Sequence, residues 1–215
     1  MVTVMKKNAF IWDLDGTLFD SYDEIVSSVL LTLEHFGIEE DEKEARRYMV
    51  LYSVKKYFMK IENETGIPYT ELKSLFESFH HSRYMEVTAM PHATEILQYL
   101  QDHGHLSFVF THRTSSTLPI LRNLNMLSYF TEVVTIGEGF ARKPDPQAVR
   151  YLLEKYSLDP EYTWYVGDRK IDMECGRNAG IKTILYLPAG NSAEPSGLED
   201  YVIKDLMDIT SMNLI

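Results

Sequence analysis

Two carboxylates, Asp13 and Asp15, follow an apolar run over residues 9–12 and precede a glycine, Gly16. Apolar residues bounded by a glycine turn are typical of a buried strand. Strand side chains alternate between faces, so both carboxylates are expected on one side, at the edge where open α/β sheets bind ligands. Such neighbours repel and need a cation or a shared proton, and Mg²⁺ suits an all-oxygen site. A solvated Asp-Gly turn is the alternative, and this stretch alone does not decide between them.

Size and charge narrow the class of protein. The chain has 215 residues, a formal charge of −11 and 45% apolar residues, enough for one α/β domain with a modest insertion. The acidity argues against nucleic acid as a partner. No long apolar run indicates a membrane span, and no apolar segment of signal length precedes Asp13. A single cysteine, Cys175, excludes an intrachain disulfide and fits a reducing compartment. We therefore expect a cytoplasmic protein.

The spacing of apolar residues divides the chain into two kinds of segment. Between residues 20 and 87 the spacing is helical, and no strand pattern interrupts it. The helical stretches expected there are 25–36, 48–59 and 72–84. From about residue 88 onward short β-rich runs alternate with helical ones, which predicts a parallel sheet with helices on both faces. The expected strands are 106–110, 132–136, 162–166, 182–187 and 201–203; the expected helices include 91–104, 115–125, 146–156 and 171–179, with another near the C-terminus. Residues 1–19 and 88–215 are thus predicted to form an α/β core, and residues 20–87 an inserted all-helical domain.

Three further stretches carry residues suited to chemistry. Thr111 ends a β-rich run, where its hydroxyl could bind a phosphoryl oxygen or cap a helix. Lys143 precedes two prolines that fix the backbone before a helix, so its ammonium could reach a phosphate and Asp13. Asp168 ends an apolar strand, and Asp172 lies one helical turn later, so the two can face one site. A helix cap and a first-turn carboxylate are the alternative for this last pair.

Together these stretches resemble, in order, the four motifs of the haloacid dehalogenase-like superfamily: Asp-x-Asp-Gly-Thr-Leu at 13–18, a strand-ending Thr at 111, Lys-Pro-x-Pro at 143–146, and Gly-Asp-x-x-x-Asp at 167–172. The resemblance implies a Rossmann-like, doubly wound, mostly parallel sheet with an inserted helical cap, as in phosphoglycolate phosphatase-like members. The chain departs from the family at His112 and Arg113, where Asn or a small residue is usual after the Thr.

The resemblance also implies a reaction. Asp13 would attack phosphorus to form an aspartyl-phosphate, while Asp15 protonates the leaving oxygen and then activates water. Mg²⁺ and Lys143 would offset charge on the transferring group. The implied phosphate-binding residues are Gly16, Thr17, Thr111, His112 and Lys143. The implied metal ligands are Asp13, Asp15 and Asp168, with Asp172 acting through water.

The expected function is Mg²⁺-dependent hydrolysis of a small phosphorylated metabolite by a monomer or weak dimer. Asp15 argues against dehalogenation, because a halide leaves without a proton. Three alternatives stay open: a β-phosphoglucomutase-like transfer to a sugar phosphate, a phosphonoacetaldehyde-type hydrolase that uses Lys55, Lys56 or Lys60 as a Schiff base, and a non-catalytic binding protein that keeps the fold.

Overall fold

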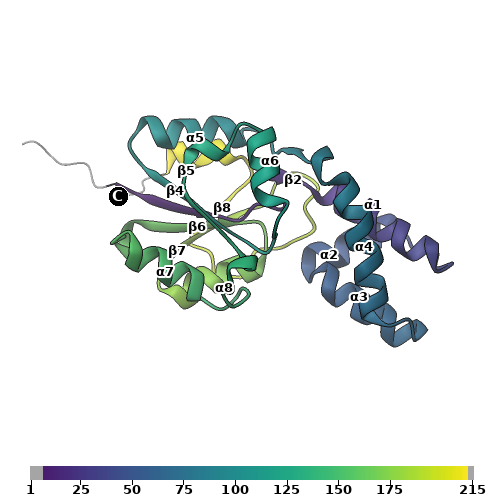
Figure 1. Ribbon diagram of the computed structural model, residues 1–215. Coiled ribbons are helices and arrows are strands. Elements are labelled where there is room, and N and C mark those ends of the chain that lie inside the picture. Colours follow the sequence, from purple (N-terminus) through teal and green to yellow (C-terminus); the bar gives the residue numbers. More distant parts are fainter. Residues whose placement is uncertain (1–6, 213–215) are drawn as a thin grey trace, which may run out of the picture.

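The computed structural model describes residues 7–212, and it has two parts: a sheet with helices on both faces, and a group of four helices at one end (Figure 1). All strand pairs of the six-stranded sheet are parallel, in the order β5-β4-β1-β6-β7-β8. The strands are β1 (Ala9–Trp12), β4 (Leu106–Thr111), β5 (Phe130–Thr135), β6 (Thr163–Gly167), β7 (Lys182–Tyr186) and β8 (Tyr201–Ile203). This arrangement confirms the predicted fold class.

Strand β1 lies at the point where the strand order reverses. It pairs with β4 on one side, with Ile11 opposite Phe108, and with β6 on the other, with Ile11 opposite Tyr165. The chain fills one half of the sheet through β4 and β5, then returns across β1 to build β6, β7 and β8. In doubly wound sheets the crevice beyond such a reversal is where ligands bind. The carboxyl end of β1 is therefore the place to look for a site.

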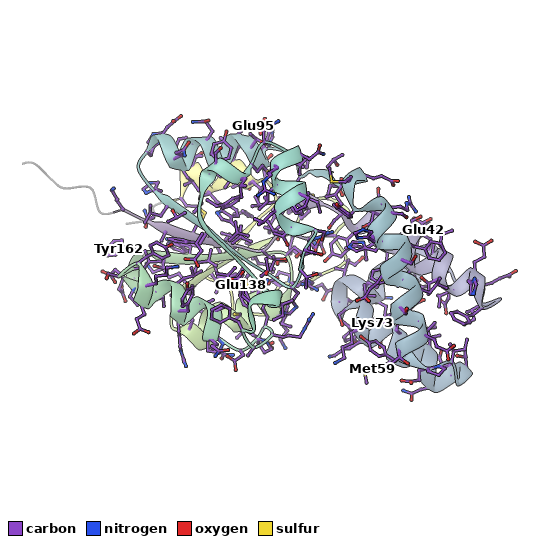
Figure 2. All side chains as sticks on the ribbon, viewed as in Figure 1. Glu42, Met59, Lys73, Glu95, Glu138 and Tyr162 are labelled. Atoms are coloured by element: carbon purple, nitrogen blue, oxygen red, sulfur yellow. The ribbon has the colours of Figure 1, made fainter. Side chains whose placement is uncertain are left out.

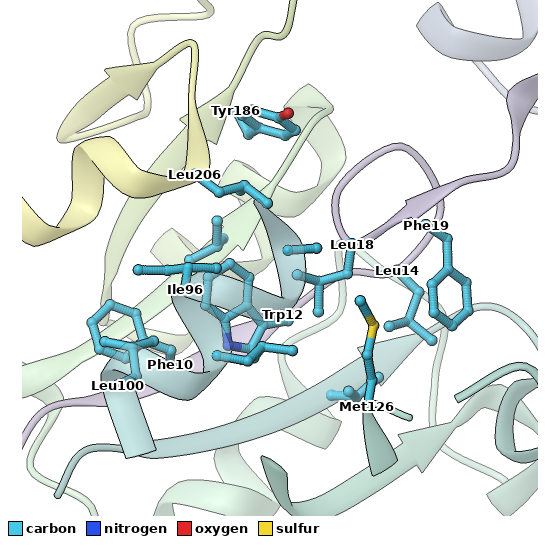
Figure 3. Close-up of a cluster of buried hydrophobic side chains, with 14 of the residues drawn as sticks. Phe10, Trp12, Leu14, Leu18, Phe19, Ile96, Leu100, Met126, Tyr186 and Leu206 are labelled. Carbon is cyan, nitrogen blue, oxygen red and sulfur yellow. The ribbon is translucent and has the colours of Figure 1, made fainter. Parts of the chain in front are cut away.

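The side chains of β1 alternate between two apolar layers. Phe10 and Trp12 belong to one buried cluster with residues of α5 (Ala93–Asp102), as Figure 3 shows. Ile11 belongs to a second cluster on the other face, with residues of α7 (Gln147–Lys155) and α8 (Lys170–Ala179). Because β1 is buried on both faces, its run of apolar residues is unbroken. The helices that cover the sheet are α5 (Ala93–Asp102), α6 (Thr117–Asn123), α7 (Gln147–Lys155) and α8 (Lys170–Ala179).

The second part, which we call the helical part, has its own apolar core. Its helices are α1 (Tyr22–His35), α2 (Glu42–Leu51), α3 (Val54–Thr65) and α4 (Tyr69–Arg83). Buried side chains from all four helices form one cluster, separate from the two on the sheet. The labelled side chains of Glu42, Met59 and Lys73 lie exposed on this part (Figure 2). Its two connections to the sheet pair with each other, because β2 (Phe19–Asp20) runs antiparallel to β3 (Thr88–Ala89).

The structure corrects several expected elements. The stretch 48–59 is not one helix: α2 ends at Leu51, and α3 begins after Ser53, whose hydroxyl accepts a hydrogen bond from the Lys56 backbone at 3.1 Å. Serine favours this capping position over a helix interior. The helix expected over 115–125 spans only residues 117–123, because the residues just before it form the loop after β4. The expected C-terminal helix is a 3₁₀ turn, Leu206–Ser211.

Further 3₁₀ turns connect the main elements: Tyr84–Glu86, Leu127–Tyr129, Ile136–Glu138 and Pro160–Tyr162. Within residues 7–212, the helices are all too short or too polar to cross a membrane.

The contact of α8 with the sheet generates a stability prediction. A Cβ atom added at Gly176 would lie 2.5 Å from Thr183 Cγ2 and 3.0 Å from Tyr165 Cβ. Alanine is the better helix former, but overpacking here should dominate. We expect Gly176→Ala to lower the free energy of unfolding by about 1–2 kcal/mol, as measured by urea denaturation. In the control Gly137→Ala, the nearest atom would lie 3.4 Å away, and we expect a change within about 0.5 kcal/mol. Equal stability of the two variants would contradict this account of the packing.

Candidate active site

The ends of three neighbouring strands bring the predicted residues together. Asp13 directly follows β1, and its backbone N–H donates to the Val166 carbonyl of β6 at 2.9 Å. Asp168 directly follows β6, and Thr111 is the last residue of β4, on the other side of β1. The parallel register therefore collects side chains that lie far apart in the sequence at one edge of the sheet.

Three buried carboxylates form a group at this edge. Asp13, Asp168 and Asp172 each offer an oxygen within 4.8 Å of the others. Asp13 Oδ2 is buried and has no hydrogen-bond partner within residues 7–212. Burial raises the pKa of Asp13 to about 6 against the opposing charge of Lys143, and burial raises the pKa of Asp168 to about 7 against that of Arg169. Carboxylate oxygens so placed, one of them unpartnered, fit a hard divalent cation such as Mg²⁺.

Lys143 is the cation that joins two members of this group. Its fully buried ammonium donates to Asp13 Oδ1 at 2.6 Å and to Asp172 Oδ1 at 2.7 Å. Burial lowers the pKa of Lys143, but the two carboxylates outweigh it and the pKa stands above its usual value. Asp172 Oδ2 accepts from the Arg169 backbone N–H at 3.2 Å. Both oxygens of Asp172 are thus engaged, and its indirect contact to a metal stays a prediction.

Position 16 favours glycine for two reasons: the conformation of the backbone and the close packing around it. Its φ is +78°, and an added Cβ would lie 2.4 Å from both Asp168 Oδ2 and a ring carbon of Tyr22. The next residue, Thr17, donates to Asp168 Oδ1 at 3.5 Å. Tyr22, in the first turn of α1, donates from its hydroxyl to Asp168 Oδ2 at 2.9 Å. The helical part therefore contacts the carboxylate group directly through Tyr22.

Asp15 lies outside the group of three carboxylates, although the sequence suggested it as a metal ligand. Its Oδ1 accepts from Arg113 Nε at 2.6 Å and from Ser21 Oγ at 2.7 Å. Burial raises the pKa of Asp15, but Arg113 and Ser21 outweigh it, so the pKa is lower than usual. The resting structure therefore holds Asp15 as a carboxylate, the form that accepts a proton.

The two residues after β4 have structural contacts. Thr111 Oγ1 accepts from the Arg113 backbone at 3.1 Å. His112 Nε2 accepts from the Lys143 backbone N–H at 2.9 Å, which fixes the segment that carries the ammonium. Burial, then the charges of Lys143 and Arg142, lower the pKa of His112 to about 2, so the ring stays neutral as an acceptor must. Substrate contacts for Thr111 and His112 stay predictions.

Three site residues were not assigned from the sequence. Arg113 was noted only as a departure from the family pattern. Tyr22 stands at the start of a helix without a local signal. Arg169 lies inside the fourth motif, and its Nη2 is 3.9 Å from Asp13 Oδ2 and its Nε is 3.9 Å from Asp168 Oδ1. The signal available for Arg169 was its position next to Asp168, where a cation can lie beside the carboxylates.

The chain is similar to several known proteins. A family model, haloacid dehalogenase-like hydrolase, matches residues 10–186. A protein named pyrophosphatase PpaX from Bacillus velezensis is 28% identical over 212 residues, 97% of each chain. Another of that name, from Bacillus mycoides, is 30% identical over 95% of this chain and 96% of the relative. The crystal structure of a hydrolase from Streptococcus pneumoniae is 26% identical, with a TM-score of 0.65 over 97% of this chain and 100% of that one.

The chain belongs to the haloacid dehalogenase-like hydrolases, as its motifs indicated. Within that family it is a phosphatase. This confirms the predicted class of enzyme and sets aside the alternative of a non-catalytic binding protein.

The bridge between Lys143 and two carboxylates predicts a pH-dependent loss of stability. Lys143→Met removes the ammonium that pairs with the buried Asp13 and Asp172, so the free energy of unfolding in metal-free buffer at pH 7 should fall by about 3–5 kcal/mol. Above pH 3.8 the unfolded chain loses a proton that folded Asp13 keeps up to about pH 6, so this residue lowers stability as the pH rises. Without Lys143, the free energy of unfolding should fall more steeply with rising pH, and the fall should continue to higher pH.

Urea denaturation at several pH values measures this effect. The control Lys73→Met removes an exposed lysine on α4 that pairs with Glu77, and we expect a change within about 0.5 kcal/mol. A pH-independent loss in Lys143→Met would contradict the role given to the carboxylates.

Proposed function

We propose that the protein is a Mg²⁺-dependent phosphatase that hydrolyses a small phosphorylated substrate through an aspartyl-phosphate on Asp13. The observation that carries this proposal is the state of Asp13 itself. Lys143 fixes one of its oxygens, and the other is buried without a hydrogen bond from the described residues. A nucleophile that is oriented, desolvated and flanked by cations is what attack on phosphorus requires.

Different residues of the chain carry out different steps of this reaction. Asp13 forms the bond to phosphorus, and Lys143 and Arg169 place positive charge where the phosphoryl oxygens gain negative charge. Asp15, held as a carboxylate, takes a proton from the water that releases Asp13. To protonate an alkoxide leaving group first, Asp15 must itself have taken up a proton from solvent, and a looser contact with Arg113 would favour that protonated form. Asp13 and Asp168 would hold Mg²⁺, with Asp172 behind them, and the bound ion would offset charge on the transferring group.

The substrate has two candidates. A small phosphomonoester is the expectation from the sequence. The second candidate is inorganic pyrophosphate, because two relatives that span nearly the whole chain are named pyrophosphatase. The guanidinium groups of Arg113 and Arg169 beside Asp15 and Asp13 also suit a substrate with more than one phosphate.

The phosphonate alternative has less support. Of the three lysines considered for a Schiff base, Lys55 and Lys56 are exposed, and Lys60 lies 3.7 Å from Glu64 and over the rings of Tyr48 and Tyr57. A lysine that forms a Schiff base needs a pKa below its usual value. Desolvation lowers the pKa of a lysine, whereas a neighbouring carboxylate raises it.

A substrate panel tests the proposal. The wild-type protein is assayed for orthophosphate release from p-nitrophenyl phosphate, pyrophosphate and a set of phosphorylated metabolites, each with Mg²⁺ and with EDTA. Metal-dependent release from at least one substrate is expected, and the ranking of the substrates separates an ester from an anhydride. Transfer to a sugar phosphate without orthophosphate release would favour the mutase.

The nucleophile yields the next prediction. Asp13→Asn keeps the shape of the side chain but removes its charge, so turnover should fall by at least about 10³-fold while circular dichroism stays that of wild type. Asp102→Asn, on the exposed end of α5, is the matched control and should retain full activity. Activity of Asp13→Asn within tenfold of wild type would place the nucleophile elsewhere.

Metal removal is the second test of the mechanism. Dialysis against EDTA should abolish turnover and Mg²⁺ should restore it, because the three buried carboxylates lack a divalent partner without it. Ca²⁺ should inhibit, since its larger and looser coordination shell would misplace Asp13. Steady-state rates across a metal titration measure both effects, and full activity in a metal-free preparation would contradict the metal assignment.

A further inference from the structure

Arg113 is a buried cation in which one nitrogen, Nη2, makes no hydrogen bond with the described residues. Only 7% of the residue is exposed, in the loop between β4 and α6. Its Nε donates to Asp15 Oδ1 at 2.6 Å, and its Nη1 donates to Ser116 Oγ at 3.3 Å. Nη2 is buried and has no hydrogen-bond partner within residues 7–212. A buried donor left unsatisfied is destabilising, which marks Nη2 as a position where a ligand could supply the missing acceptor.

The planar geometry of the guanidinium determines the direction in which Arg113 Nη2 donates. The group is planar and rigid, and the Nε and Nη2 hydrogens leave it along the same edge, as a fork that fits two oxygens. Asp15 occupies only the Nε half of that edge, through Oδ1, which also accepts from Ser21. The Nη2 hydrogen on this edge therefore points to the side on which Asp15 lies.

We infer that Arg113 is a specificity-determining residue that binds an anionic leaving group through Nη2, and that this group is itself a phosphate. The inference rests on the proposed function and names its substrate class, a phosphoric anhydride such as pyrophosphate. Asp15 acts where the scissile oxygen leaves, so a donor beside Asp15 is next to the leaving group. In an anhydride the second phosphorus is bonded directly to that oxygen, so its anionic oxygens lie within reach of the same fork. A neutral alcohol leaving group offers no such anion.

The chemistry balances with the residues at hand. The bond between the first phosphorus and the bridging oxygen breaks as Asp13 bonds to that phosphorus. The electron pair leaves on the second phosphate, whose charge the Arg113 N–H offsets. Water then bonds to the remaining phosphorus, Asp13 regains its carboxylate, and Asp15 accepts the proton of the water before passing it to solvent. One pyrophosphate and one water give two orthophosphates.

Two substrates with good leaving groups separate this role from an effect through Asp15. Pyrophosphate has an anionic group beside the scissile oxygen, whereas p-nitrophenyl phosphate has a phenolate that lacks one. Arg113→Lys and Arg113→Gln should each lower kcat/KM for pyrophosphate by about 10- to 100-fold, the range expected for one charged hydrogen bond. For p-nitrophenyl phosphate the loss should stay below about fivefold. Arg122→Gln, an exposed arginine on α6, is the matched control and should change neither substrate.

A binding measurement makes the inference independent of turnover. In an Asp13→Asn background with Mg²⁺, calorimetric titration should give pyrophosphate an affinity that falls about tenfold or more when Arg113→Gln is added, with little change for orthophosphate. An equal loss of kcat/KM on both substrates, or an unchanged pyrophosphate affinity, would overturn the inference and leave Arg113 as a support for Asp15. If wild type hydrolyses no substrate of the panel, the proposed function fails, and the titration still decides the role of Arg113. Arg113→Lys keeps the buried charge should Arg113→Gln not fold.

Discussion

The ammonium of Lys143 between Asp13 and Asp172 is the contact on which the rest of the site depends. It joins the end of β1, the segment before α7 and the first turn of α8, and it does so with complete burial of all three charges. A buried charge is tolerated only when it is paired and hydrogen-bonded. Neighbouring residues add hydrogen bonds to this group. His112 accepts from the Lys143 backbone N–H, and the Arg169 backbone N–H donates to Asp172.

The same need for pairing explains how the helical part meets the sheet. Asp168 lies beside the carboxylates of Asp13 and Asp172, and Tyr22 donates a hydrogen bond to it from the start of α1. Ser21, one residue earlier, donates to Asp15. Two consecutive residues at the junction thus contact two catalytic candidates. Because β2 and β3 pair directly beside them, a change in the orientation of the helical part would alter hydrogen bonds inside the active site.

Electrostatics also give the two aspartates of the first motif different environments. Asp13 is desolvated near other carboxylates, so its pKa rises to about 6, whereas Arg113 and Ser21 lower the pKa of Asp15 despite its burial. Pairs of titratable groups whose environments push their pKa values apart commonly divide catalytic roles between them. One cause of the difference is Arg113, in the loop after β4, which lies about a hundred positions along the chain from the aspartates that follow β1.

The sequence by itself determined the parallel α/β core, the helical insertion and the carboxylates at strand ends, because periodicity and short motifs are local and survive without knowledge of contacts. It could not show that Ser53 divides one expected helix into two, since a cap competes with helix continuation over a single residue. Nor could it assign Tyr22, Arg113 or Arg169. Their roles depend on which buried charge each one meets, and only the tertiary structure decides that, by bringing distant segments within hydrogen-bond or ion-pair distance.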